Sequence, residues 1–233
     1  MAARRGGLPL HVGTESHDAM WSAKDITQPA VEKYLYGLLP KSDPVLREME
    51  RYADRKDVPI VGPAVGRLLY LLTQLSGAKR IFEMGSAIGY STLWFARAAG
   101  QGAEVHYADG SAANARRAQA YFHRAGMAGR IHVHVGMAQE KLAETAGEFD
   151  IIFIDVDKEQ YPDTLRLALP RVRRGGLLLT DNTLWSGRAA RKAKRGDAQT
   201  RGIQEFNRMV FASKELFAAM VPLRDGFTIC RKM

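Results

Sequence analysis

Acidic and amide side chains follow two apolar runs in the second half of the chain. The run FDIIFID ends in Asp155, with Lys158 three positions further on, and the run GLLLT is followed by Asp181 and Asn182. If both runs are neighbouring parallel strands, their ends meet at one edge of a sheet. Two carboxylates and an amide oxygen favour Mg²⁺ or Ca²⁺ over zinc, which prefers nitrogen and sulfur. The alternative is structural, with the acids capping helices and pairing with Lys158.

A glycine-containing loop follows the first apolar run of this half. It carries Gly85 and Gly89, with Ala87 between them, and leads into a helical stretch that begins near Ser91. A dinucleotide site needs a further glycine two positions after the first. Two glycines instead leave room for an adenosine, and the helix N-terminus offers N–H groups to a carboxylate, which matches S-adenosylmethionine. Asp109 follows the second run, where it can accept both ribose hydroxyls; the alternative is an ordinary turn with a capping acid.

Short apolar runs alternate with longer helical stretches from residue 79 onward. This alternation predicts an α/β fold with a doubly wound, mostly parallel, seven-stranded sheet, Rossmann-like, with ligands at the carboxyl ends of the strands. Before Gly77 the pattern is helical, with Thr27 and Ser42 or Asp43 as caps and Pro29 and Pro44 in first turns. We expect an N-terminal tail over 1–25 and one domain over 26–233, with helices over 26–77 and the Rossmann-like core over 78–233. The five principal strand runs are 80–84, 103–108, 130–135, 149–155 and 176–180.

Composition is that of an ordinary globular protein, with 233 residues, 46% hydrophobic and 25% charged. The longest nearly uncharged apolar stretch, over 68–78, is far shorter than the ~18 residues of a membrane span. The first residues lack an apolar run of signal-peptide length. Cys230 has no partner cysteine in the chain, which favours a reducing compartment. We therefore expect a cytoplasmic protein without membrane contact.

The charge balance is basic. Lys and Arg number 34 against 25 Asp and Glu, for a net charge of +9, which attracts polyanions. A cluster over 188–195 carries five positive charges and no acid. It is either a solvated loop or a lid over an anionic substrate such as a CoA ester, a phosphorylated compound or RNA.

Three collinear segments resemble the cation-dependent class I O-methyltransferases, which include catechol and caffeoyl-CoA O-methyltransferases and bacterial relatives. The segments are EMGSAIGYST, FIDVDKEQY and LTDNTLWSGR, and the resemblance covers roughly residues 26–233. Val156 stands where the family commonly has alanine. Valine is bulkier than alanine, so it narrows the space beside the implied metal and affects the fit of the substrate.

The resemblance implies roles for particular residues. Asp155, Asp181 and Asn182 would bind the divalent cation (Mg²⁺, or Ca²⁺ or Mn²⁺), and Lys158 would be the catalytic base. The residues implied to hold or border S-adenosylmethionine are Val61 near its methionine end, Glu83, Gly85, Ser91, Asp109, Ala138 and Gln139 near its adenine, and Asp155. We also expect a homodimer.

Four functions compete. The first is Mg²⁺-dependent methyl transfer from S-adenosylmethionine to a small vicinal-dihydroxy aromatic of the catechol type. The second keeps the chemistry but methylates a wobble 5-hydroxyuridine in tRNA, because residues 38–60 resemble the N-terminal region of such relatives. A nicotinamide oxidoreductase is opposed by the missing glycine. A non-catalytic RNA-binding module leaves the cluster of Asp155, Lys158, Asp181 and Asn182 without a purpose.

Overall fold

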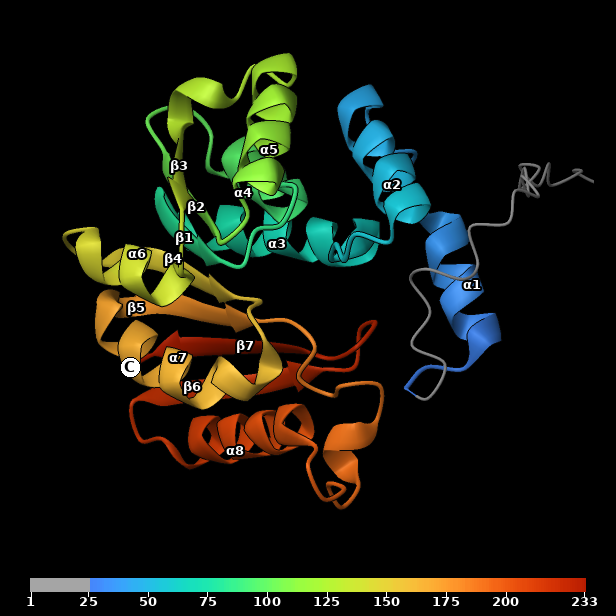
Figure 1. Ribbon diagram of the computed structural model, residues 1–233, viewed down its shortest axis with the longest axis vertical. Helices are drawn as coiled ribbons and strands as arrows, with labels where there is room; N and C mark the ends of the chain where they lie inside the picture. Colours follow the sequence, from blue (N-terminus) through green and yellow to red (C-terminus); the bar gives the residue numbers. More distant parts are fainter. Residues whose placement is uncertain (1–25) are drawn as a thin grey trace, which may run out of the picture.

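The computed structural model describes residues 26–233; the expected tail over 1–25 lies outside them. Seven strands form one sheet between two groups of helices (Figure 1). The strands are β1 (Arg80–Met84), β2 (Glu104–Asp109), β3 (Ile131–Val135), β4 (Phe149–Ile154), β5 (Val172–Thr180), β6 (Leu216–Val221) and β7 (Phe227–Lys232). The helices are α1 (Pro29–Leu38), α2 (Pro44–Lys56), α3 (Gly62–Ser76), α4 (Tyr90–Ala99), α5 (Ala112–Arg124), α6 (Ala138–Glu144), α7 (Tyr161–Ala168) and α8 (Ala198–Ala212). Four short 3-10 helices are η1 (Ala128–Arg130), η2 (Lys158–Gln160), η3 (Leu169–Arg171) and η4 (Arg188–Ala190).

The sheet order is β3-β2-β1-β4-β5-β7-β6. The first five strands pair in parallel, whereas β7 is antiparallel to both β5 and β6. The predicted doubly wound, mostly parallel sheet of seven strands is therefore confirmed. The order reverses between β1 and β4, which is where such folds form a crevice for a ligand.

Two apolar cores lie on opposite faces of the sheet. One contains buried residues of α2, α3, α4 and α5, and the other contains those of α6, α7 and α8. Strand residues alternate between the two cores, as Ile81 and Phe82 do, because successive side chains of a strand point to opposite faces. The sheet is thus covered on both sides, which explains the nearly continuous apolar runs in β4 and at the end of β5.

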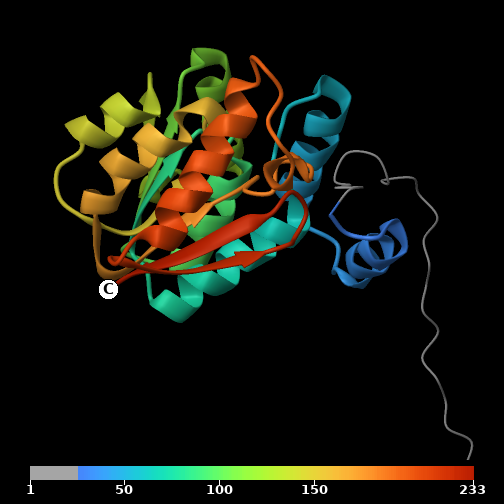
Figure 2. The ribbon, with the colours of Figure 1, turned by 90° about the horizontal axis from the view of Figure 1, so that it is seen from below.

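The N-terminal helices form as the cap and turn residues indicate, with one difference. Asp43 caps α2 by accepting the N–H groups of Val45 and Leu46, and Gly77 ends α3 in the left-handed conformation. The N-cap of α1 is Gln28, not Thr27. The Thr27 hydroxyl donates instead to the carbonyl of Pro222, at 3.4 Å, because a tertiary contact is available there. Figure 2 shows α1 set outside the two helix layers.

No helix within residues 26–233 is long and apolar enough to cross a membrane. Cys230 is buried in β7 as a free thiol, where it packs as a small apolar residue.

Candidate active site

The loop after β1 is built for close approach. Gly85 has φ 87°, and a Cβ atom there would lie 2.3 Å from the carbonyl oxygen of Asp155. Only glycine fits both the left-handed backbone and the contact with the end of β4. The loop therefore brings the start of α4 next to the candidate metal ligand.

Asp109 and Tyr107 hold this loop from β2. One Asp109 carboxylate oxygen accepts the N–H of Ala87 at 2.9 Å, and the other accepts the N–H of Ser111 at 2.8 Å. The Tyr107 hydroxyl donates to the Ala87 carbonyl at 2.6 Å, which fixes Ala87 in its left-handed conformation, φ 44°. The oxygen that binds Ser111 also accepts the Asn114 amide at 3.2 Å, so the oxygen that binds Ala87 is the one that keeps further acceptor capacity. The capping role and the ribose role that the sequence offered as alternatives are thus compatible.

Glu83 lies under the loop with no exposed surface. Burial raises the pKa of its carboxyl group to about 7, against hydrogen bonds from Ser91 and Thr92 that favour the ionised form. The Thr92 hydroxyl donates to Glu83 Oε2. This hydrogen bond ties β1 to the first turn of α4.

Gln139 and Ala138 begin α6, beyond the end of β3. The Gln139 amide nitrogen donates to Gln160 at 2.8 Å and to the Thr164 hydroxyl at 3.1 Å. Its amide oxygen is buried and has no hydrogen-bond partner within the described chain. An unpaired acceptor at this position suits a donor such as the amino group of adenine. Val61 lies buried at the N-cap of α3.

The candidate metal ligands converge from β4 and β5, which pair in parallel up to Ile154 and Thr180. Asp155 and Asp181 each follow directly. Asp181 is 1% exposed, and its Oδ1 atom has no partner within residues 26–233. Burial raises the Asp181 pKa to about 6, while Arg224 acts in the opposite direction.

Asn182 adopts the left-handed conformation, φ 56°, that places it beside these carboxylates. Its amide nitrogen donates to Asp225 at 3.3 Å, so its amide oxygen is directed elsewhere and remains available. Residues 26–233 hold no group of three or more His, Cys, Asp and Glu side chains able to bind a metal. A cation bound here would therefore need the Asn182 oxygen as a third ligand beside the two carboxylates. The Asp181 oxygen that has no partner among these residues is suited to be a ligand as well.

Lys158 completes the cluster from η2. Its Nζ atom lies 2.8 Å from Asp155 Oδ1 and 3.1 Å from the Val156 carbonyl. Burial lowers the Lys158 pKa, but the charge of Asp155 and its hydrogen bond to Lys158 outweigh burial and leave the pKa above its usual range. Without a bound cation, Lys158 is therefore an ammonium group.

Aromatic side chains border Lys158. Its Nζ lies 5.2 Å from the Tyr161 ring centre and 5.9 Å from that of Trp185. The Tyr161 hydroxyl donates to the Asp181 carbonyl at 3.0 Å, which joins the start of α7 to the end of β5. Trp185 has φ 50°, so the segment after Asn182 turns sharply back over the cluster.

Sequence reasoning missed three residues at this rim. Arg224 and Asp225 come from the turn between β6 and β7, and Tyr36 comes from α1. Burial raises the Tyr36 pKa to about 12, with Arg224 opposing and Glu32 and Asp181 adding to the shift. The sequence signal for this turn is the charged pair before Gly226, which stands between two strand-like runs. The sequence around Tyr36 contains no signal that would place it at this rim.

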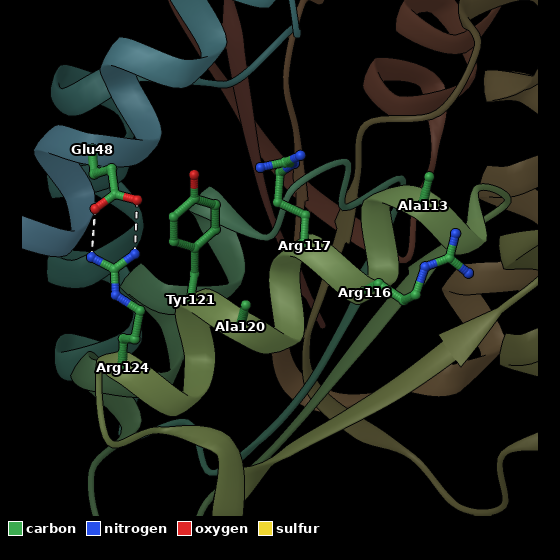
Figure 3. Close-up of a pocket in the computed structure, with 7 residues that line it drawn as sticks. All are labelled: Glu48, Ala113, Arg116, Arg117, Ala120, Tyr121 and Arg124. Atoms are coloured by element: carbon green, nitrogen blue, oxygen red, sulfur yellow. Dashed lines mark hydrogen bonds and ion pairs between the residues drawn. The ribbon is translucent and has the colours of Figure 1, made fainter.

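A separate groove of about 400 Å³ lies between α2 and α5 (Figure 3). Arg124 binds Glu48 across it with two hydrogen bonds, and Arg117 stacks on Tyr52 at 3.9 Å. None of the candidate site residues lines this groove, which is an arginine-rich surface feature distinct from the site.

The sheet order, the glycine loop and the acid after β2 together define the α/β fold of S-adenosylmethionine-dependent methyltransferases. Residues 40–233 match the model of the O-methyltransferase family. A catechol O-methyltransferase of Niastella koreensis is 32% identical over 200 residues, 83% of this chain and 90% of that protein. The chain belongs to the O-methyltransferase family, and the predicted resemblance and enzyme class are confirmed.

Solved structures agree with this assignment. The O-methyltransferase from Bacillus cereus in complex with SAH superposes with a TM-score of 0.80 at 29% identity, covering 91% of this chain and 100% of that one. The O-methyltransferase TomG from Streptomyces achromogenes, involved in tomaymycin synthesis and solved in complex with SAM, superposes with a TM-score of 0.80 at 28% identity. The match covers 88% of this chain and 96% of that one.

Proposed function

We propose that this O-methyltransferase transfers a methyl group from S-adenosylmethionine to one hydroxyl of a small catechol-type aromatic, with Mg²⁺ or a similar divalent cation. The observation that carries the proposal is the convergence of Asp155, Asp181, Asn182 and Lys158 at one rim, with a buried Asp181 oxygen that has no partner among the described residues. The catechol O-methyltransferase from Niastella koreensis, at 32% identity, supports the acceptor class.

The cofactor would lie along the loop after β1. Asp109 would accept ribose hydroxyls, the Gln139 oxygen would accept an adenine donor, and Gly85 would allow close approach of the methionine part. Val61 and Ala138 supply apolar walls, and Glu83 and Ser91 hold the loop in shape. The SAH and SAM complexes of the two solved relatives support this cofactor.

A divalent cation held by Asp155, Asp181 and Asn182 would draw charge from two adjacent hydroxyl oxygens and lower the pKa of the attacking one. Lys158 Nζ would accept the proton of that hydroxyl. Its ammonium group must first lose a proton, and relief of its pairing with Asp155 lowers its pKa in that direction. Trp185 would pack on the planar ring.

The test is methyl transfer from labelled S-adenosylmethionine, in Mg²⁺, to three separate acceptors: catechol, its monomethyl ether and undermodified tRNA. We expect label in catechol, little in the ether, which lacks the second free hydroxyl, and none in tRNA. Asp181→Asn should lose this activity, whereas Asp163→Asn, a matched change at a residue 81% exposed, should keep it. Label confined to tRNA would overturn the small-molecule acceptor.

We also propose that the enzyme is a cytoplasmic homodimer whose residues 26–233 form one domain. Sedimentation of the purified protein tests the dimer.

A further inference from the structure

The turn between β6 and β7 reaches the rim that carries the candidate metal ligands. Because β7 is antiparallel to β5, with Thr180 opposite Thr228, the residues just before β7 lie beside those just after β5. In Figure 1 this turn extends toward α1. Two charged residues, Arg224 and Asp225, occupy it.

Arg224 forms a buried ion pair with Asp181. Its Nη1 atom lies 3.0 Å from Asp181 Oδ2, and the two side chains are 16% and 1% exposed. Arg224 holds this position with φ 51°, a left-handed backbone that arginine adopts only at an energetic cost. The strained backbone at Arg224 is thus found together with an ion pair between its guanidinium group and the Asp181 carboxylate.

The neighbouring residue fixes the other candidate ligand from β5. Asp225 accepts a hydrogen bond from the Asn182 amide nitrogen, at 3.3 Å, and from the Ser186 N–H. One turn therefore holds Asp181 through Arg224 and Asn182 through Asp225.

Each of the two candidate carboxylate ligands is paired with a positive side chain in this state. Lys158 pairs with Asp155 at 2.8 Å, and Arg224 pairs with Asp181 at 3.0 Å. A divalent cation placed between the two carboxylates meets two positive side chains already bound there. Charges that are poorly screened by water repel strongly at such distances.

We propose that Arg224 is a tethered cation that holds Asp181 in the metal-free enzyme and competes with the divalent cation for it, which sets the metal affinity of the site. This inference rests on the proposed metal site. It differs from a role in orienting Asp181 for the metal, because competition predicts tighter metal binding when Arg224 is removed and orientation predicts weaker binding.

The test is Mn²⁺ binding, measured by isothermal titration calorimetry, to the wild type and to Arg224→Asn and Arg224→Gly. Asn and Gly both tolerate the left-handed backbone, so each removes the charge while preserving the turn. We expect at least about tenfold tighter Mn²⁺ binding by both variants, since an unscreened positive charge beside the site is lost. Arg208→Gln, at an exposed position on α8, removes the same charge away from the site and should bind as the wild type does.

A second readout is thermal stability. In EDTA, both Arg224 variants should melt below the wild type, because Asp181 is left buried without its partner. In saturating Mn²⁺ this difference should disappear. A purely structural role of Arg224 would lower the melting temperature in both conditions and would not tighten metal binding.

Two kinds of failure are distinguishable. If the wild type binds Mn²⁺ and both Arg224 variants bind it equally or more weakly, competition is wrong and the metal site stands. If neither the wild type nor the variants bind Mn²⁺, the metal site and this inference are both wrong.

Discussion

The Nζ atom of Lys158 lies 2.8 Å from Oδ1 of Asp155, and the two side chains are 12% and 22% exposed. The proposed base and a proposed metal ligand thus share one hydrogen bond before any cation binds. Release of this bond lowers the Lys158 pKa, and loss of one ammonium proton to solvent would then give a nitrogen able to accept the proton of the proposed acceptor hydroxyl.

Lys158→Met keeps the length of the side chain and removes the basic nitrogen. If Lys158 accepts the proton, turnover should fall roughly 10²- to 10⁴-fold, with little change in the affinity for S-adenosylmethionine. Turnover per folded molecule and cofactor affinity are measured on one preparation.

A salt-bridge role for Lys158 makes a different prediction. The variant would then be less stable and have nearly normal turnover. Raising the pH separates the two further, because hydroxide removes the proton in place of the missing base and partly rescues a variant whose only defect is proton removal.

Asp109→Ala should weaken S-adenosylmethionine binding by about 1–3 kcal/mol, the scale of a charge-assisted hydrogen bond. The same change frees the Ala87 N–H, which Asp109 holds at 2.9 Å. Asn114→Ala serves as the control, because it removes a 3.2 Å hydrogen bond to Asp109 but leaves the carboxylate. Titration calorimetry measures both; equal dissociation constants for Asp109→Ala and the wild type would contradict the ribose assignment.

Gly202→Ala should disturb the segment that carries Lys158. A Cβ atom at Gly202 would lie 2.3 Å from the Lys158 carbonyl oxygen and 2.7 Å from the Glu159 Cα, so α8 or η2 must shift. Overpacking of this kind costs about 1–3 kcal/mol, and turnover should fall with it. Gly129→Ala has no atom within 4 Å of the new Cβ and should leave melting temperature and turnover unchanged.

A histidine cluster at the outer strands predicts acid sensitivity. His106 is 6% exposed, its Nδ1 lies 3.0 Å from His134 Nε2, and its ring stacks on that of His132 at 4.9 Å. Burial lowers the His106 pKa to about 4, with the neighbouring positive groups acting in the same direction and Glu104 opposing. The folded state therefore prefers neutral His106.

The preference for neutral His106 adds to the free energy of unfolding. This contribution is fully present above pH ~6.5, the pKa of histidine in the unfolded chain, and is lost as the pH falls toward 4. The contribution is on the order of 1–3 kcal/mol. His106→Gln cannot gain a proton, so its melting temperature should fall less than that of the wild type between pH 7 and pH 5. His123→Gln, at an exposed position, should follow the wild type; a common slope for all three proteins would contradict the prediction.

Local pattern predicted the fold and much of the rim. Apolar runs bounded by helical stretches specify parallel strands, and the parallel arrangement alone places the ends of β4 and β5 together. Asp155 and Asp181 were predictable for that reason, as was Gly85, whose residue type reflects the close approach of the loop to β4.

Residues that reach the rim from distant parts of the chain were not predictable in the same way. Arg224 arrives there because β7 is antiparallel between β5 and β6, and the order of strands is not written in any one of them. Tyr36 depends on where α1 packs. The hydrogen bond from Thr92 to buried Glu83 likewise depends on the packing of α4 on β1.

The most direct test of the proposed metal-dependent transfer is turnover of catechol by exhaustively dialysed enzyme, compared in excess EDTA and in Mg²⁺. Turnover should be at background in EDTA and return on addition of Mg²⁺, because two carboxylates and an amide oxygen at one rim would hold the cation that ionises the acceptor. Equal turnover in EDTA and in Mg²⁺ would contradict this account.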